Sequence, residues 1–298
     1  MSMKRVDIKT GFLCNNNCRF CVQANNKCKG NRSFEEIKQN LIECRERCDE
    51  VVLTGGEVTI RKDFFEIVRF AKELGYKEIQ IQTNGRMFSS LEFCKKTIDA
   101  GATQFSPALH GYCEEQHDYL TQSKGSFKQV VKGIMNLKKL NQLVVTNTVI
   151  VKSNYRDCER IAKLLVKLKV NQFQFAFVHA MGNALENFDS MVPNITLASE
   201  YIKKGLDVGI RANITAMAEA LTPCLMRGYE RHLSENYIPD TEIRGKDFQN
   251  TNDFTKQRQE SGKKKFKQCV GCKFDDMCEG PWREYPDRRG DEEFRAVK

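Results

Sequence analysis

Three cysteines within eight residues constrain this chain more than any other feature of its sequence. Cys14, Cys18 and Cys21 stand at spacings of four and three, directly after a short, partly alternating stretch at residues 6–13. We expect that stretch to form the first strand, so that one tight loop carries the three thiols. Zinc sites usually use four ligands, whereas three cysteine thiolates on an iron–sulfur cubane leave one iron without a protein ligand. The spacing therefore favours a cluster with an open iron, and a zinc loop is the alternative.

The composition indicates a cytoplasmic globular protein. The 298 residues, 40% of them hydrophobic, suffice for one large α/β domain or for a domain of about 200 residues and a smaller one. No run approaches the ~18 apolar residues of a membrane span, and the start lacks the apolar segment of a signal peptide. Thirteen cysteines without an export signal favour free thiols and metal ligands over disulfides.

Six cysteines outside the two ligand groups are interpreted as ordinary small side chains: Cys28, Cys44, Cys48, Cys94, Cys113 and Cys158. The net charge of +9 is compatible with nucleic acid, an acidic protein partner or an anionic substrate, and charge alone does not choose among them. We interpret the lysine run at residues 263–267 as a solvated face and do not expect nucleic acid to be a partner.

The predicted elements alternate between strand and helix for about 200 residues. The expected strands are residues 5–12, 50–53, 78–82, 103–109, 143–151 and 171–178, and the expected helices include 64–74, 90–100, 127–140 and 157–168. Connections of helix length imply parallel strands with right-handed crossovers. Because no G-x-G-x-x-G follows the first strand, we expect a partial (β/α)6 barrel rather than a dinucleotide-binding fold. In barrel folds the site gathers at the carboxyl ends of the strands.

The pattern changes near residue 192. A helix at residues 196–206 and a short strand at 209–214 are expected, followed by a polar stretch at about 229–268 that is long for a structureless connection in a compact domain. We therefore divide the chain into a core at residues 1–215 and a small cysteine-rich domain at 216–298.

A second thiol group lies near the C terminus. Cys269, Cys272 and Cys278 form a C-x2-C-x5-C pattern, and Cys224 is the obvious fourth ligand. Closing the long loop between Cys224 and Cys269 costs about 3 kcal/mol of chain entropy, which a metal binding free energy of roughly 10 kcal/mol offsets. A structural zinc remains the alternative for this group.

Gly55-Gly56-Glu57 follows the second predicted strand. Glycines let the backbone approach a ligand closely, and the carboxylate can accept hydrogen bonds from an ammonium group. A turn followed by a helix cap is the plainer interpretation of the same three residues.

The first cysteine loop, C-x3-C-x-Φ-C with Phe20 before the last cysteine, resembles the signature of the radical SAM enzymes, and Gly55-Gly56-Glu57 resembles that family's GGE motif. The resemblance covers residues 6 to about 180 and 224 to 280. It implies a [4Fe-4S] cluster whose open iron binds the amino and carboxylate groups of S-adenosylmethionine. It also implies that Phe20 lies near the adenine and that Glu57 accepts hydrogen bonds from the methionine ammonium.

Further cofactor contacts follow by position. Polar residues at or near strand ends are expected to hold the ribose hydroxyls and the carboxylate: Thr83, Asn84, Ser106 and Asn147. A strand-end turn hydrogen bond is the alternative for each. His110, His117 and His179 are possible acid/base or substrate groups, although a lone histidine is more often structural. No residue is assigned to catalysis.

The C-terminal triplet resembles part of the auxiliary-cluster domain called SPASM, or its shorter form, twitch. The fuller pattern has another cysteine four residues on, where this chain has Trp282. We therefore expect one auxiliary [4Fe-4S] cluster with four cysteine ligands, Cys224 among them.

The resemblance implies reductive cleavage of S-adenosylmethionine to a 5′-deoxyadenosyl radical, which abstracts hydrogen from substrate. An acidic flavodoxin or ferredoxin is the expected electron donor and would suit the positive net charge. A peptide undergoing modification is the first hypothesis for the substrate. Because the chain begins almost at the first strand, we expect no fused leader-peptide domain, and a small-molecule dehydrogenase or cofactor-biosynthesis enzyme is the runner-up. A zinc-stabilised nucleic-acid-binding protein is the hypothesis from another class.

Overall fold

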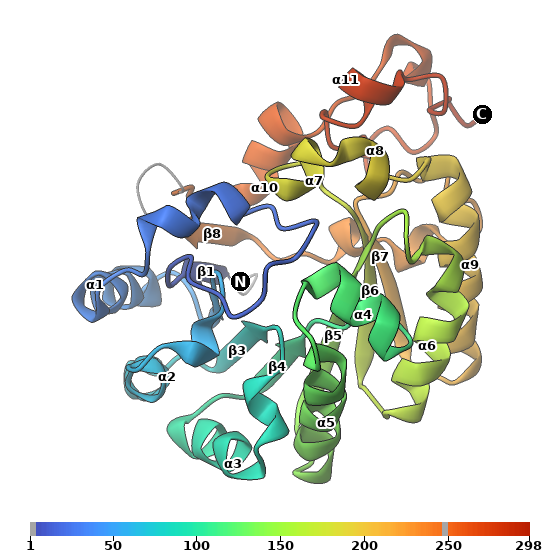
Figure 1. Ribbon diagram of the computed structural model, residues 1–298. Coiled ribbons are helices and arrows are strands. Elements are labelled where there is room, and N and C mark those ends of the chain that lie inside the picture. Colours follow the sequence, from blue (N-terminus) through green and yellow to red (C-terminus); the bar gives the residue numbers. More distant parts are fainter. Residues whose placement is uncertain (1–3, 246–249) are drawn as a thin grey trace.

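The molecule is built on a curved sheet of eight parallel strands that does not close into a complete barrel (Figure 1). The computed structural model describes residues 4–245 and 250–298. The strand order is β7-β6-β5-β4-β3-β2-β1-β8, so β7 and β8 are the two edges. The strands are β1 (Arg5–Lys9), β2 (Glu50–Thr54), β3 (Glu78–Thr83), β4 (Gln104–Pro107), β5 (Leu143–Ile150), β6 (Gln172–Phe177), β7 (Thr215–Glu219) and β8 (Thr241–Arg244).

Helices cover the outer face of this sheet, and the C-terminal segment lies beside α7 and α8 (Figure 1). The helices are α1 (Phe34–Arg45), α2 (Phe64–Glu73), α3 (Leu91–Ala100), α4 (Glu114–Thr121), α5 (Ser126–Lys139), α6 (Cys158–Lys167), α7 (Asn183–Glu186), α8 (Phe188–Met191), α9 (Ile195–Arg211), α10 (Phe254–Gln257) and α11 (Pro286–Arg289). Among the described helices none is long and apolar enough to cross a membrane.

Strand side chains alternate between the helix-covered face and an inner cavity, as the pleat of a β-strand requires. In β3, Ile79 and Ile81 are buried in the core, whereas Gln80 and Gln82 line the cavity. The partial barrel of parallel strands that the sequence predicts is thereby confirmed. The six predicted strands are all present as β1 to β6, each within a few residues of its expected ends.

The prediction of a strand at residues 209–214 is wrong. Helix α9 continues to Arg211, and β7 begins only at Thr215. Gly209 does not stop the helix, because its missing side chain makes room for the Phe173 ring: a Cβ there would lie 2.6 Å from Phe173 Cε1. The glycine marks close packing of α9 against β6 rather than the end of a helix.

The polar stretch at residues 229–268 contributes a strand that the sequence analysis did not anticipate. β8 pairs in parallel with β1, Arg5 opposite Thr241. The expected boundary at 215/216 falls within β7, and β7 and β8 both belong to the barrel sheet. The cysteine-rich part of the chain therefore follows β8 in sequence, apart from Cys224.

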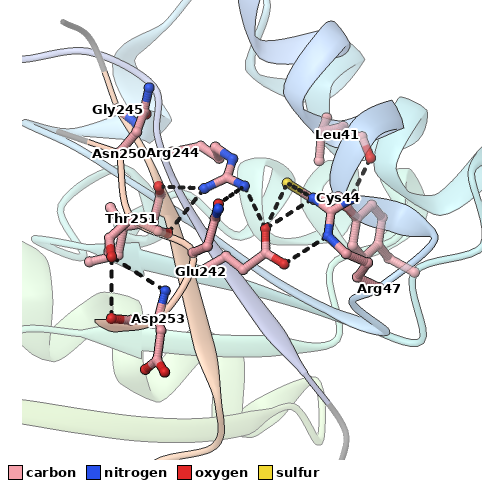
Figure 2. A network of polar contacts seen from close by, with 12 residues as sticks. Leu41, Cys44, Arg47, Glu242, Arg244, Gly245, Asn250, Thr251 and Asp253 are labelled. Atoms are coloured by element: carbon pink, nitrogen blue, oxygen red, sulfur yellow. Dashed lines mark hydrogen bonds and ion pairs between the residues drawn. The ribbon is translucent and has the colours of Figure 1, made fainter. Parts of the chain in front are cut away.

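An ion cluster around the buried carboxylate of Glu242 joins β8 to the end of α1. Figure 2 shows Glu242 of β8 directed at Arg47, with Cys44 and Arg244 beside it. The Glu242 carboxylate accepts hydrogen bonds from Arg47 Nε at 2.9 Å and from Arg244 Nη2 at 2.6 Å, and Cys44 Sγ lies 3.7 Å away. Burial alone would raise the pKa of Glu242, but the two guanidinium groups outweigh burial and lower it.

Candidate functional site

The loop with Cys14, Cys18 and Cys21 follows β1 and is held by backbone hydrogen bonds to two other loops. Asn17 N donates to Thr121 O, and Arg19 N donates to Leu120 O, both over 2.9 Å at the end of α4. On its other side the loop meets the start of α7, where Asn183 Nδ2 donates to Cys18 O at 2.8 Å and Asn183 N donates to Cys21 O at 3.1 Å. The loop is thus fixed before any cofactor binds.

The three thiols are half-buried and close enough to influence one another electrostatically. Burial raises the pKa of Cys18 to about 12, and the neighbouring Cys21 and Cys14 add to the shift. Thiols with raised pKa values become thiolates when a metal supplies positive charge. In the described part of the chain, no three His, Cys, Asp or Glu side chains are arranged around a single metal ion. Three cysteine thiols on one loop are the donor type that iron–sulfur clusters use.

Arg86, just after β3, donates hydrogen bonds to the cysteine loop. The sequence did not predict this role. Arg86 Nη1 donates to Asn15 O at 2.5 Å and to Asn16 Oδ1 at 2.8 Å, while its Nε donates to Gln129 Oε1 at 2.6 Å. Lys27 Nζ donates to Asn16 O at 3.1 Å on the same loop. The available signal was a basic residue directly after Thr83-Asn84-Gly85.

The Gly55-Gly56-Glu57 loop packs against the backbone that leads into the cysteine loop. Gly56 N donates to Gly11 O and Glu57 N donates to Leu13 O, each over 2.8 Å. A Cβ on Gly55 would lie 2.4 Å from Gly11 O, and one on Gly56 would lie 2.4 Å from Leu13 O. Gly55 and Gly56 are therefore required because these two strand-end loops lie in close contact.

The Glu57 carboxylate is buried and connects the ends of β2 and β3. Its Oε1 accepts hydrogen bonds from Thr59 N at 3.1 Å, Thr59 Oγ1 at 2.5 Å and Thr83 Oγ1 at 2.7 Å. Its Oε2 accepts from Asn84 N at 2.6 Å. Burial raises the pKa of Glu57, while these hydrogen bonds oppose the shift. Glu57 and Thr83 therefore organise the strand ends from which Asn84 Nδ2 reaches Asn15 Oδ1 at 2.6 Å.

Phe20 is buried against a pair of histidines. Its ring meets His110 edge-on, with centroids 4.7 Å apart. His110 Nδ1 accepts from Val149 N at 3.2 Å, and His117 Nδ1 accepts from His110 N at 3.0 Å. Burial lowers the pKa of His117 to about 4 and that of His110 well below its ordinary value. Both rings are therefore neutral near pH 7 and engaged in backbone hydrogen bonds.

Ser106 and Asn147 do not lie on the loops around the cysteines but line the inner cavity of the barrel. Asn147 Oδ1 is buried and has no hydrogen-bond partner among the described residues. A buried acceptor without a partner costs about 1–3 kcal/mol, so a ligand that donates to it would be favoured. Of the predicted cofactor contacts, Ser106 and Asn147 are the two that line this cavity.

The four C-terminal thiols converge on one pocket. Cys224, Cys269, Cys272 and Cys278 all line one pocket. Two of the sulfurs already accept backbone hydrogen bonds: Val297 N donates to Cys272 Sγ at 3.3 Å, and Gly280 N donates to Cys278 Sγ at 3.4 Å. Hydrogen bonds to sulfur are among the factors that set cluster potentials, and a four-thiol donor set fits an iron–sulfur cluster.

Comparisons with known proteins agree with this geometry. The chain matches the Radical SAM superfamily over residues 8–165. A probable GTP 3′,8-cyclase of Saccharolobus islandicus is 30% identical over 157 residues, covering 52% of this chain and 50% of that protein. The chain thus spans about half the length of the curated relatives it matches.

Two solved structures share the fold. Streptococcus suis SuiB bound to its precursor peptide SuiA has a TM-score of 0.68 at 15% identity, covering all of this chain and 76% of that one. Native anSMEcpe with bound AdoMet has a TM-score of 0.70 at 14% identity, covering 98% of this chain and 93% of that one. The family match supports the radical SAM prediction over the alternative of a zinc-stabilised nucleic-acid-binding protein. The chain belongs to the radical SAM superfamily.

Proposed function

We propose that this chain is a radical SAM enzyme whose catalytic [4Fe-4S] cluster is held by Cys14, Cys18 and Cys21. The observation that carries the proposal is the fixed three-thiol loop at the carboxyl ends of the strands, inside the region that matches the family. When bound, the cluster and S-adenosylmethionine supply a 5′-deoxyadenosyl radical that abstracts hydrogen from a substrate. The residues of this chain position the partners and exclude water.

The surrounding residues are proposed to bind S-adenosylmethionine. Phe20 offers an apolar surface for the adenine, and Glu57 Oε2, which has a single protein donor against three on Oε1, offers an acceptor for the methionine ammonium. The proposed set is Phe20, Gly55, Gly56, Glu57, Thr83, Asn84, Ser106 and Asn147. Within it, Gly55, Gly56 and Thr83 act through the shape of the loops, and the free Oδ1 of Asn147 supports direct contact with a ligand.

We further propose that the C-terminal part, residues 216–298, is a SPASM/twitch-type region with one auxiliary [4Fe-4S] cluster on Cys224, Cys269, Cys272 and Cys278. The shared pocket of the four thiols supports this ligand set. This part of the chain also contributes to the two edge strands of the barrel sheet, β7 and β8.

For the substrate, a peptide undergoing modification is our first proposal, supported by a likeness in fold to SuiB, whose structure holds a precursor peptide. A small molecule in cofactor biosynthesis is the second, favoured by the relatives named as probable GTP 3′,8-cyclases. An acidic flavodoxin or ferredoxin is the proposed electron donor, in keeping with the net charge of +9.

Formation of 5′-deoxyadenosine tests the proposal. Anaerobically reconstituted protein with dithionite and S-adenosylmethionine should form it, and Cys18→Ala should not. Cys28→Ala is the matched control, because Cys28 is exposed and lies outside both thiol groups. Product formation by Cys18→Ala at the control rate would contradict the ligand assignment.

Iron content tests the auxiliary site separately. Cys272→Ala should lose part of the iron and keep the cluster on the first loop, while Cys113→Ala, which removes a thiol outside the pocket, should keep all of it. Unchanged iron in Cys272→Ala would refute the second ligand set.

A further inference from the structure

The inner face of the barrel lines a large, open cavity of about 780 Å³. Side chains from seven strands line it, from Arg5 at the start of β1 to Glu219 at the end of β7. Tyr237 and Pro239, just before β8, line it at the amino ends of the strands. Because Glu219 is the last residue of β7, it lies at the carboxyl ends of the parallel strands, where the cysteine loop also lies.

The charges that line this cavity are strongly unbalanced. Among the described lining residues, the acids are Asp7, Glu50, Glu78 and Glu219, and the only base is Arg5. Arg5 is already engaged, since its Nε lies 3.1 Å from Asp7 Oδ1. Glu50 and Glu78 stand opposite each other on β2 and β3, an arrangement of like charges that destabilises a sheet. Four lining carboxylates thus share one lining cation, which stands opposite Glu50 and also acts on Glu219.

The polar neutral side chains add hydrogen-bond acceptors. Five glutamines line the cavity: Gln80, Gln82, Gln104, Gln172 and Gln174. Gln174 Nε2 donates to Glu219 Oε2 at 2.5 Å, and its Oε1 accepts from Ser234 Oγ at 2.7 Å. These contacts fix the orientation of Glu219 and leave its other oxygen, Oε1, for a ligand.

The two cations behind Glu219 are neutralised by other carboxylates. Lys263 Nζ lies 2.7 Å from Glu235 Oε1 and 3.0 Å from Glu279 Oε2. Arg258 makes two hydrogen bonds to Glu279, of 2.5 and 2.6 Å. With Glu219 this buried group holds three carboxylates and two cations, so one negative charge remains when Glu219 is ionised. Burial, helped by the Glu235 carboxylate, raises the pKa of Glu219 to about 7.

We propose that the cavity binds the substrate through an alkylammonium or guanidinium group that pairs with Glu219. The inference rests on the proposed function, in which Ser106 and Asn147 of this cavity contact the cofactor. A guanidinium carries five donors and no acceptor, which suits a cavity rich in carboxylates and carboxamides. A peptide with a lysine or arginine side chain meets this requirement.

The same charges disfavour a nucleoside triphosphate. Its phosphates need arginine, lysine or a metal ion, and the one lining guanidinium in the described structure is paired with Asp7. The lining charges of this cavity therefore do not favour GTP, the substrate for which those relatives are named.

Calorimetric titration of the cluster-loaded protein tests the inference. The probes are butylguanidine, its uncharged isostere butylurea, and GTP with magnesium. We expect butylguanidine to bind at least tenfold more tightly than butylurea, and Glu219→Gln to remove this preference. Glu92→Gln, at an exposed position on α3, is the matched control and should retain it. Tighter binding of GTP, or a preference that survives Glu219→Gln, would overturn the inference.

A pH series on the unaltered protein keeps the test decisive if Glu219→Gln does not fold. Butylguanidine stays cationic and butylurea stays neutral between pH 6 and 8. The groups that act on Glu219 are Gln174, Glu235, Lys263, Arg258 and Arg5. With a pKa of about 7, ionisation of Glu219 should raise the affinity for butylguanidine about tenfold across this range. A flat profile refutes the pairing. Formation of 5′-deoxyadenosine, measured in parallel, reports on the proposed function independently of the probe.

Discussion

The imidazole of His179 stacks face to face on the indole of Trp282, with ring centroids 4.0 Å apart and 7° between the planes. His179 follows β6, and Trp282 occupies the position at which the fuller SPASM pattern has a cysteine. Glu284 Oε2 lies 3.2 Å from His179 Nε2, and Lys263 Nζ lies 5.3 Å from the indole centroid. The residue that departs from the pattern therefore connects the C-terminal segment to the barrel.

Loss of this stack should be visible in fluorescence, because Trp282 is the single tryptophan of the chain. We expect His179→Ala to shift the emission to longer wavelength and to lower the free energy of unfolding by about 1 kcal/mol, the contribution of one aromatic pair. His232→Ala, whose ring lies by Tyr229, is the control and should leave the emission unchanged. An unshifted spectrum in His179→Ala would contradict the stack.

Glu57→Gln should destabilise the protein and weaken S-adenosylmethionine binding together. An amide in place of the carboxylate leaves at least one buried donor without an acceptor, at a cost of about 1–3 kcal/mol. Urea unfolding and equilibrium binding of S-adenosylmethionine measure the two effects. Glu92→Gln, at an exposed position, should change neither by more than about 0.5 kcal/mol. Wild-type affinity in Glu57→Gln would rule out contact with the cofactor.

Arg86→Met should loosen the cysteine loop without removing a thiol. The substitution deletes the hydrogen bonds to Asn15 O and Asn16 Oδ1, so we expect faster loss of iron to a chelator at an unchanged ligand count. Absorbance near 400 nm followed over time measures this loss. Arg69→Met, an exposed arginine on α2, is the matched control. Equal rates for the two variants would show that Arg86 does not support the loop.

Gly56→Ala should cost far more than an alanine at a glycine in open space. A Cβ at Gly56 would lie 2.4 Å from Leu13 O and 2.5 Å from Phe12 O, so the two loops must separate, at about 2–3 kcal/mol. Gly228 has φ of +84° and nothing within 4 Å, so Gly228→Ala should cost about 1 kcal/mol from backbone strain alone. Denaturant titrations compare the two, and equal losses would argue against the close packing of the loops.

The Glu242 cluster should make β8 sensitive to acid. Because the folded pKa is below that of the unfolded chain, about 4.3, the stabilising contribution is fully present above that pH. It is lost as the pH falls through the folded pKa. The difference in unfolding free energy between wild type and Glu242→Gln, about 1–3 kcal/mol at pH 7, should shrink below pH 4. A difference independent of pH would show that the carboxylate charge does not hold the strand.

The strands β1 to β6 and the two thiol groups could be predicted because their signals are local. Alternating apolar residues fix which face of β3 is buried, and the spacing of Cys14, Cys18 and Cys21 fixes which thiols share a loop. The end of α9 and the strand β8 could not be predicted in this way. The strand expected from Gly209 is helix instead, and the packing partner of that glycine, Phe173, lies on β6 and is distant in the sequence.

The sequence by itself determined the local features of the proposed cofactor site. A thiol triplet after the first strand, a Gly-Gly-Glu after the second, and membership of a family follow from residues that are neighbours in the chain. Only the tertiary structure decided which charges line the inner cavity. The cavity charge sums side chains from four strands, and the contact that anchors β8 joins Arg47 to Glu242 across 195 residues. Electrostatic balance depends on distances in space, which sequence spacing does not give. The raised pKa of Glu219 is therefore a property of the folded chain alone.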